Sequence, residues 1–467
     1  MGEGGKRKSR QEEVPAPPSH RILTADELGL LKVSEVPAGD KWEETAAKQR
    51  WGLPDKAQGI TRLQVHCPDW DPDRCLVAAA RSSGRVTLHA GSDGGDVGSF
   101  RAAPPASTSG RSDTSTNAVQ ALRFSQPEGS TQLLISAATL GGHVSVHRCP
   151  VEAALATAAA GRAVHTWEEA ARLQTISDLQ AMDVSSSGRY LAVGGDGHQL
   201  KVWDLEVAGK AAMASTTSSA GPDGAAAAAP KAGEPLFAGK AGKPSRSGLQ
   251  DLAHVTALAF VPGQDDKQVL VGTAKHKLWL YDMRAGRKPQ AELVWGEGRI
   301  TTLQPVADGS RIWVGNGRGH VEALDLRQAP AKLSMGHALK GVAGSIRALA
   351  LHPSEPLIAS VSLDRHLRVH HSTKRSSLAK LYLKQALTGV AWLPPLPAAA
   401  AAEGAKEDEE EQARAEAEEV DAAEEEEQQD AGRVARGKGK HSGRDQQAGG
   451  GSRGQHGKKK DSKRRKQ

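Results

Sequence analysis

The chain has 467 residues, of which 25% are charged and only 3% are aromatic, so its core must be built mainly from aliphatic side chains. No stretch approaches the ~20 consecutive apolar residues that a membrane helix needs, so we expect no membrane span. The formal charge of +6 is spread unevenly, with a basic body and an acidic run beside a basic one in the tail. This distribution favours nucleic acid or a ribonucleoprotein surface as partner, and simple solubility is the alternative explanation.

Residues 1–19 are basic and have no apolar segment behind the charges, which predicts a disordered N-terminus and not a secretory signal. In Ile22–Val33 the apolar pattern predicts two short strands. They resemble the second and third strands of a repeating unit that has no first strand before them.

A repeated strand pattern fills the middle of the chain. Each unit has an alternating apolar strand, a turn, a short strand that ends in a small residue, a turn with Gly or Asp, and a third strand. The first strands of successive units begin near Ile60, Val119, Leu179, Val255, Ile300, Ile346 and Leu387. The last three steps, of 45, 46 and 41 residues, match the roughly 40–45-residue period of WD40 propeller blades.

The earlier steps, of 59, 60 and 76 residues, are too long for a bare blade. Segments 94–117, 149–178 and 207–250 are rich in Gly, Ser, Thr or Ala, and we interpret them as low-complexity insertions. Without them, residues 20–397 correspond to about seven blades of ~40 residues. The sequence therefore predicts an all-β, seven-bladed WD40-type β-propeller.

The two ends of this propeller region are both incomplete. Leu387–Leu393 looks like a first strand with nothing after it. Because open sheet edges invite pairing with other chains, we expect this strand to complete one blade together with Ile22–Val33.

Residues 398–467 contain almost no apolar bulk, which predicts a disordered tail. From Glu403 to Asp430, fifteen acidic residues against Lys406 and Arg414 give a net charge of −13. From Ala431 to Gln467, thirteen basic residues against two acidic ones give +11. The tail is thus acidic first and then basic.

Three dipeptides end third strands at the position of the Trp-Asp that names WD repeats: Trp203-Asp204, Tyr281-Asp282 and Leu324-Asp325. Asp364 matches the aspartate of the turn between second and third strands. In this position an aromatic ring packs between blades and an aspartate ties a turn, so we interpret these residues as scaffold and not as catalytic acids.

The sequence offers no arrangement that would carry chemistry. The glycine-rich stretches 194–197 and 315–319 precede strands, whereas a phosphate loop needs a helix directly after its glycines. His366 and His370 lie in a strand pattern, no HExxH motif is present, and there is no nucleophile elbow. We therefore predict no catalytic residues, no cofactor and no metal site, and we expect a protein that is not an enzyme.

Basic residues recur in the turns between second and third strands. A propeller gathers these turns on one face, so they would form a basic rim able to bind the phosphates of rRNA, or a partner. The alternative is that polar turns simply often contain Lys and Arg. The rim residues are Arg81, Arg85, Lys275, Lys277, Arg318, Arg365 and Arg368.

The chain also has a basic cluster of the nuclear-localisation type. Together with the weaker GKRKSR at Gly5–Arg10, it favours residence in the nucleus or nucleolus. The cluster comprises Lys458, Lys459, Lys460, Lys463, Arg464, Arg465 and Lys466.

Beyond the repeat pattern, Leu339–His371 and the LYLKQALTGVAW that follows resemble the nucleolar Nop-seven-associated WD-repeat proteins. Ile22–Val33 and the blade at Thr301–Arg327 resemble the same family. The resemblance covers about 250–393 and is specific at Gly341-Val342, which replaces the Gly-His of ordinary WD repeats. The long segments before residue 250 depart from the compact form of the family.

The resemblance implies a seven-bladed propeller that assists assembly of the large ribosomal subunit. Such a factor would contact rRNA and other assembly-factor proteins on nucleolar pre-60S particles, and an AAA-type ATPase would release it. The alternative is a WD40 scaffold or adaptor of another nuclear complex, such as a chromatin or ubiquitin-ligase complex, because the fold alone does not reveal the partner.

Overall fold

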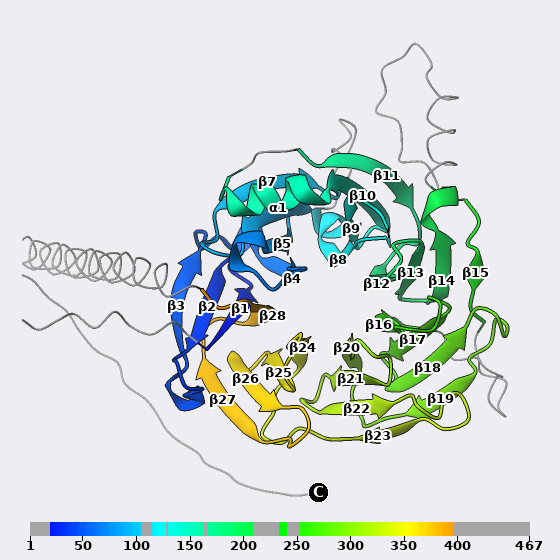
Figure 1. The fold of residues 1–467 in the computed structure, drawn as a ribbon. Coiled ribbons are helices and arrows are strands. Elements are labelled where there is room, and N and C mark those ends of the chain that lie inside the picture. Colours follow the sequence, from blue (N-terminus) through cyan, green and yellow to red (C-terminus); the bar gives the residue numbers. More distant parts are fainter. Residues whose placement is uncertain are drawn as a thin grey trace, which may run out of the picture. The chain divides into compact units, whose positions relative to one another are not determined.

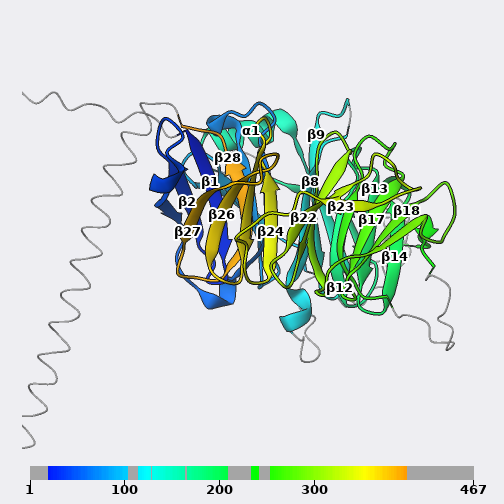
Figure 2. The ribbon, with the colours of Figure 1, turned by 90° about the horizontal axis from the view of Figure 1, so that it is seen from below.

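The computed structural model describes residues 19–103, 114–127, 129–162, 166–208, 233–240 and 253–396. They form seven four-stranded antiparallel sheets, which stand as blades around one axis (Figure 1). Seen from the side, the blades make a thick disc (Figure 2). The predicted seven-bladed β-propeller is confirmed. No helix in the described part of the chain is long and apolar enough to cross a membrane.

The first strand of each blade lies nearest the axis, and each begins at the residue where the sequence pattern placed it. These innermost strands are β4 (Ile60–His66), β8 (Val119–Ser125), β12 (Leu179–Val184), β16 (Val255–Phe260), β20 (Ile300–Pro305), β24 (Ile346–Leu351) and β28 (Leu387–Leu393). In all seven, the pairing with the second strand shifts register after the first residue. Such a bulge re-aims the side chains beside it.

The second strands are almost wholly buried, because neighbouring blades cover both of their faces. They are β1 (His20–Asp26), β5 (Leu76–Arg81), β9 (Gln132–Thr139), β13 (Tyr190–Gly195), β17 (Gln268–Thr273), β21 (Arg311–Asn316) and β25 (Leu357–Ser362). The third strands are β2 (Leu31–Val36), β6 (Arg85–Ala90), β10 (His143–Pro150), β14 (His198–Asp204), β18 (Lys277–Asp282), β22 (Val321–Asp325) and β26 (His366–His371).

The fourth strands form the outer edge of each blade. They are β3 (Ala46–Trp51), β7 (Asp96–Arg101), β11 (Glu168–Gln174), β15 (Phe237–Ala238), β19 (Ala291–Val294), β23 (Ser334–Gly336) and β27 (Ser377–Tyr382). The described helices include α1 (Val151–Ala159) and the short 3-10 turns η1 (Trp42–Glu44), η2 (Lys56–Gln58), η3 (Pro72–Arg74) and η4 (Thr114–Asn117).

Three of these outer strands lie inside the segments interpreted above as low-complexity insertions. Segment 94–117 contains β7, segment 149–178 contains α1 and β11, and segment 207–250 contains β15. The prediction that these segments are insertions outside the blades is therefore wrong in part, because they supply the fourth strands β7, β11 and β15. Outer strands are half-exposed and lack a regular apolar alternation. In β11, for example, only one of seven residues is buried, so composition did not reveal the strand.

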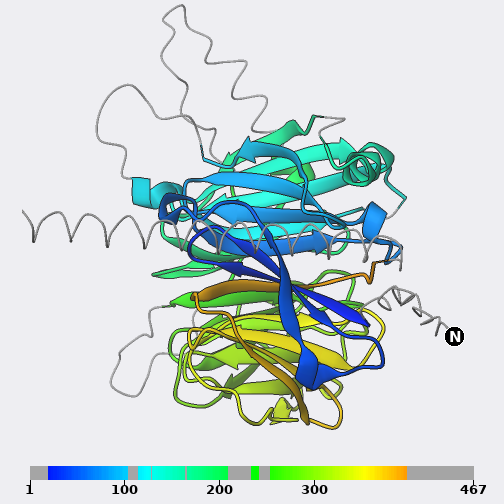
Figure 3. The same ribbon diagram turned by 90° about the vertical axis from the view of Figure 1, so that its left-hand side faces the viewer.

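The blade that closes the ring combines the two ends of the propeller region, in the strand order β28-β1-β2-β3. Figure 3 shows β28 beside β1, and the pairing sets Ile22 opposite Trp392 and Leu23 opposite Ala391. The predicted closure is confirmed. The segments predicted to be disordered, 1–19 and 398–467, lie outside the described residues except for Ser19.

Candidate nucleic-acid interface

The turns between second and third strands lie on one face of the propeller. The connections that lead from one blade into the first strand of the next lie on the same face. We call it the turn face. In each blade, a backbone amide of the turn donates to a carbonyl of the entering connection at 2.8–3.1 Å. Examples are Ser82 to Gly59, Ala274 to His254, Gly317 to Arg299 and Leu363 to Ser345. The seven predicted rim residues therefore lie at turns of the same face.

Four of the seven rim residues are exposed on this face: Arg85, Lys275, Arg318 and Arg365. They belong to four different blades. Arg318 lies 3.3 Å from the carboxylate of Glu297, but both side chains are more than half exposed, so solvent screens the pair strongly. These four cations remain able to reach a phosphate group.

The other three rim residues are partly or fully buried. Arg368 is only 3% exposed, and its guanidinium donates to the Asp364 carboxylate and to Ser362 Oγ. Arg81 is half-buried and donates to the carbonyl oxygens of Gly29 and Gln58. Lys277 forms a 3.0 Å ion pair with Glu292.

For Arg368 and Arg81, the expectation of an exposed binding residue is corrected by these contacts. Arg368 neutralises an aspartate inside its own turn, and Arg81 ties two neighbouring connections together. The sequence pattern placed both residues at the right turn. It did not show that their side chains fold back into the protein.

The predicted anchor aspartates hold turns, as expected. Asp204 Oδ1 accepts from Glu206 N at 3.1 Å, and Asp325 Oδ1 accepts from Arg327 N at 3.0 Å. The ring of Trp203 is buried among side chains of its own and the preceding blade. These residues act as scaffold.

One group of potential metal ligands occurs among the described residues: His20, His352 and Glu355. His352 Nδ1 accepts hydrogen bonds from the backbone amides of Ser354 and Glu355, at 3.4 and 3.1 Å, which leaves the ring proton on Nε2. A nitrogen that carries a proton cannot ligate a metal. His20 stacks on Trp42 with ring centroids 4.8 Å apart. We therefore interpret the two histidines as part of an aromatic cluster and not as metal ligands.

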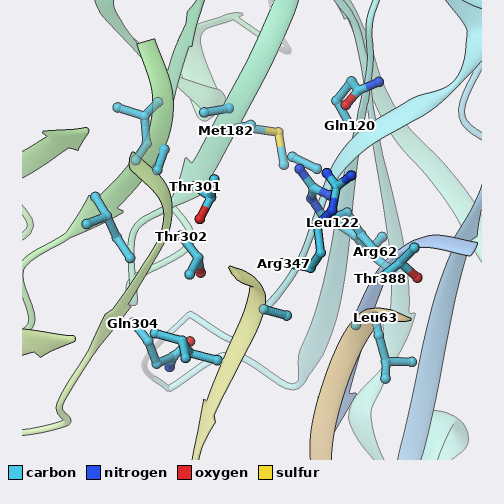
Figure 4. Close-up of a pocket in the computed structure, with 18 of the residues that line it drawn as sticks. Arg62, Leu63, Gln120, Leu122, Met182, Thr301, Thr302, Gln304, Arg347 and Thr388 are labelled. Atoms are coloured by element: carbon cyan, nitrogen blue, oxygen red, sulfur yellow. The ribbon is translucent and has the colours of Figure 1, made fainter. Parts of the chain in front are cut away.

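Sequence reasoning missed a second group of cations, inside the axial channel. The channel is lined by side chains from all seven innermost strands, among them Arg62, Arg123 and Arg347. Figure 4 labels Arg62 and Arg347. The only available signal was positional: at the level of Arg62, the other innermost strands have Ala, Thr or Gly. Burial, together with the guanidiniums of Arg123 and Arg347, lowers the pKa of Arg62 to about 10.

Comparisons with known proteins agree with this architecture. The WD40 family (WD domain, G-beta repeat) matches at residues 171–204 and 333–371. The chain is similar to WD repeat-containing protein 74 of Bos taurus, with 32% identity over 199 residues, which is 42% of this chain and 44% of that protein. The mouse protein of the same name is 37% identical over 130 residues, or 27% of this chain and 32% of the relative.

The resemblance to the Nop-seven-associated WD-repeat family is confirmed. The chain matches less than half the length of these curated relatives. Among solved structures, Raptor of Chaetomium thermophilum is similar with a TM-score of 0.50 and 13% identity, covering 80% of this chain and 28% of that one. At this identity, the likeness concerns the fold alone.

The WD40 propeller is a fold that generally serves as a scaffold for partners and not as a catalyst. The predicted nuclear-localisation residues, Lys458 to Lys466, lie outside the described residues. The turn face is therefore the candidate interface within the described part of the chain.

Proposed function

We propose that this protein is a non-catalytic assembly factor of the large ribosomal subunit. In this proposal it binds rRNA and other assembly factors on pre-60S particles in the nucleolus, and an AAA-type ATPase releases it. The similarity to the Nop-seven-associated family supports the assignment. The structural observation that carries it is the set of four exposed cations on the turn face: Arg85, Lys275, Arg318 and Arg365.

These cations suit an RNA backbone because they are spread over four blades and not clustered at one point. Lys and Arg bind phosphates without reading sequence, and each contact releases condensed counterions. The turns that carry them are held by backbone hydrogen bonds to neighbouring connections. A rigid scaffold with short loops of this kind loses little entropy when it docks.

A protein partner is favoured by apolar side chains near the same turns. Leu363, in the turn between β25 and β26, is 44% exposed, and Leu53, in the connection from β3 to β4, is 86% exposed. Apolar anchors among charges are typical of protein interfaces. This observation fits contacts with assembly factors. It also keeps open the second candidate, a scaffold of a chromatin or ubiquitin-ligase complex.

Sedimentation of the tagged protein in cell extracts tests the proposal. We expect the wild-type protein to sediment with pre-60S particles. Replacing Arg85, Lys275 and Arg318 with Gln should reduce that fraction several-fold. A matched control replaces Lys288, Lys332 and Lys374, exposed lysines in the connections from third to fourth strands, which emerge on the opposite face.

The outcomes separate the candidates. A wild-type protein that sediments only with chromatin or with a ubiquitin ligase would exclude the ribosomal assignment. Equal losses in both triple variants would mean that net charge, and not the turn face, drives the association. An intact association in both would assign docking to protein contacts, without the proposed rRNA component.

A further inference from the structure

The innermost strands line the axial channel with a regular pattern that Arg62 and Arg347 break. The second residue of these strands is Thr or Gln in six blades and Arg347 in β24. The third residue is Ala, Thr or Gly in six blades and Arg62 in β4. Figure 4 shows the side chains of Arg62 and Arg347 in the same part of the channel.

Neither of these two arginines has a carboxylate partner among the described residues. Arg62 Nη1 donates only to the carbonyl oxygen of its neighbour Thr61, at 2.8 Å. The residues that line the channel include no Asp or Glu. Arg62 is partly buried, and proteins usually pair a charge that they remove from water. With the exposed Arg347 beside it and no carboxylate in the channel lining, the two guanidiniums favour an anion as ligand.

The third channel arginine provides the contrast. Arg123 Nε lies 2.5 Å from Asp183 Oδ1, and Asp183 Oδ2 accepts a hydrogen bond from Phe260 N at 2.8 Å. The Asp183 carboxylate therefore neutralises the charge of Arg123. Among the residues that line the channel, no carboxylate does so for Arg62 or Arg347.

The threonine hydroxyls near the two arginines already donate hydrogen bonds to backbone carbonyl oxygens. Thr61 Oγ1 donates to Val119 O at 2.6 Å, and Thr388 Oγ1 donates to Ala25 O at 3.3 Å. Small residues such as Ala121, Ala348 and Gly389 line the channel at the level of Arg62, and the channel encloses a cavity of about 120 Å³. The channel thus has both donors and room for a compact ligand.

We propose that the axial channel is a binding site for a small soluble anion of the phosphate class that carries at least two negative charges. Arg62 and Arg347 would each offer a planar fork of N–H donors, which matches the oxygens of a phosphate group. The site is separate from the exposed cations of the turn face. It goes beyond the proposed function, and either could hold without the other.

The pKa of Arg62 agrees with this arrangement. Burial lowers it, and the positive charges of Arg123 and Arg347 lower it further. An anion between Arg62 and Arg347 would remove that repulsion. Binding should therefore raise the melting temperature of the whole propeller, because a ligand that binds only the folded state stabilises it.

Isothermal titration of the full chain with inorganic pyrophosphate tests the site, with inorganic phosphate as a weaker probe. We expect one pyrophosphate per chain and a rise in melting temperature. The double variant Arg62→Met and Arg347→Gln should bind roughly 10-fold or more weakly, because it loses charge-assisted hydrogen bonds. The turn-face triple variant, with Arg85, Lys275 and Arg318 changed to Gln, should bind within about 2-fold of wild type.

The melting temperatures of the unliganded variants check that they fold. If the double variant does not fold, Arg347→Gln alone carries the test, since Arg347 is exposed and its loss leaves no buried group unpaired. Absence of pyrophosphate binding by the wild type would overturn the proposal. So would an unchanged affinity in the channel variants, or a loss of binding in the turn-face variant alone.

Discussion

Arg21 Nη1 donates a hydrogen bond to the carbonyl oxygen of Pro394 across a separation of 373 residues in the chain. The same guanidinium reaches the carbonyl oxygens of Gly91 and Ser92, at 3.2 and 2.9 Å. Arg21 is fully buried, so it links β1, the end of β28 and the neighbouring blade at a point without solvent. The closing blade is thus secured by a side chain as well as by strand pairing.

Replacing Arg21 with Met should destabilise the propeller by about 2–4 kcal/mol, since it leaves buried carbonyl groups without a donor. Urea unfolding followed by circular dichroism measures this change. Arg50→Met, an exposed change in β3 of the same blade, serves as control and should shift stability by less than about 0.5 kcal/mol. Equal effects of the two changes would contradict the linking role of Arg21.

Removing residues 1–35 should destabilise the whole ring. The deletion takes away β1 and most of β2, which leaves β28 without a hydrogen-bonded neighbour. We expect a lower melting temperature and aggregation in size-exclusion chromatography. Removal of residues 1–18 alone retains every described strand and should leave both readouts unchanged. An unaltered melting temperature in the longer deletion would refute the closure as the source of stability.

Acid should weaken the turn that contains Asp364. Burial disfavours its ionised form, but hydrogen bonds from Arg368 and Ser362 outweigh that effect and hold the pKa of Asp364 at about 2. A carboxyl with a depressed pKa in the folded state contributes stability above its unfolded pKa, and that contribution is lost as pH falls toward 2. The affected window is therefore about pH 4 to pH 2.

The variant Asp364→Asn isolates this contribution. At pH 7 it should be less stable than wild type by about 2–3 kcal/mol, because the buried Arg368 charge loses its partner. The difference in melting temperature should narrow as pH falls from 5 to 2.5, since the wild-type carboxyl then becomes neutral too. A gap that stays constant with pH would mean that the Asp364 charge does not stabilise the turn.

The salt dependence of RNA affinity should distinguish cations of the turn face from cations elsewhere on the surface. If Arg85, Lys275 and Arg318 each contact a phosphate, log affinity for a large-subunit rRNA transcript should fall linearly with log salt. Changing one of them to Gln should reduce the slope by about 1. The control change of Lys374, on the opposite face, should leave the slope intact. Fluorescence anisotropy at several salt concentrations measures the slope for each variant. Equal slopes in all variants would mean that the turn face does not bind RNA phosphates.

The strand framework could be predicted from the sequence because burial dictates it. Ile60, Ile300 and Leu387 begin innermost strands, and their apolar alternation marks one covered face. Outer strands such as β11 could not be found in this way. They pair on one side only and are half-exposed, so little in their residue types distinguishes them from loops.

The candidate site could be predicted only to the level of its turns. Residue type and position do not say whether a long cation extends to solvent, as Arg318 does, or folds back, as Arg368 does. That choice depends on Asp364 and on the packing of the third strand. The channel arginines required a comparison of equivalent positions in seven blades. The predicted strand starts align these positions, but the sequence does not show which of their side chains line the channel, because the bulge in each innermost strand re-aims them.

The strand order of the closing blade has a consequence for synthesis of the protein. During translation, β1, β2 and β3 emerge first, but the innermost strand of their blade, β28, emerges after every other described strand. A nascent chain therefore carries an unpaired β1 edge until Leu393 has left the ribosome. Six blades can form as they are made, while the seventh stays open to pairing with other nascent chains. Folding helpers that cover strand edges should accordingly act on residues 20–26 for nearly the whole period of synthesis.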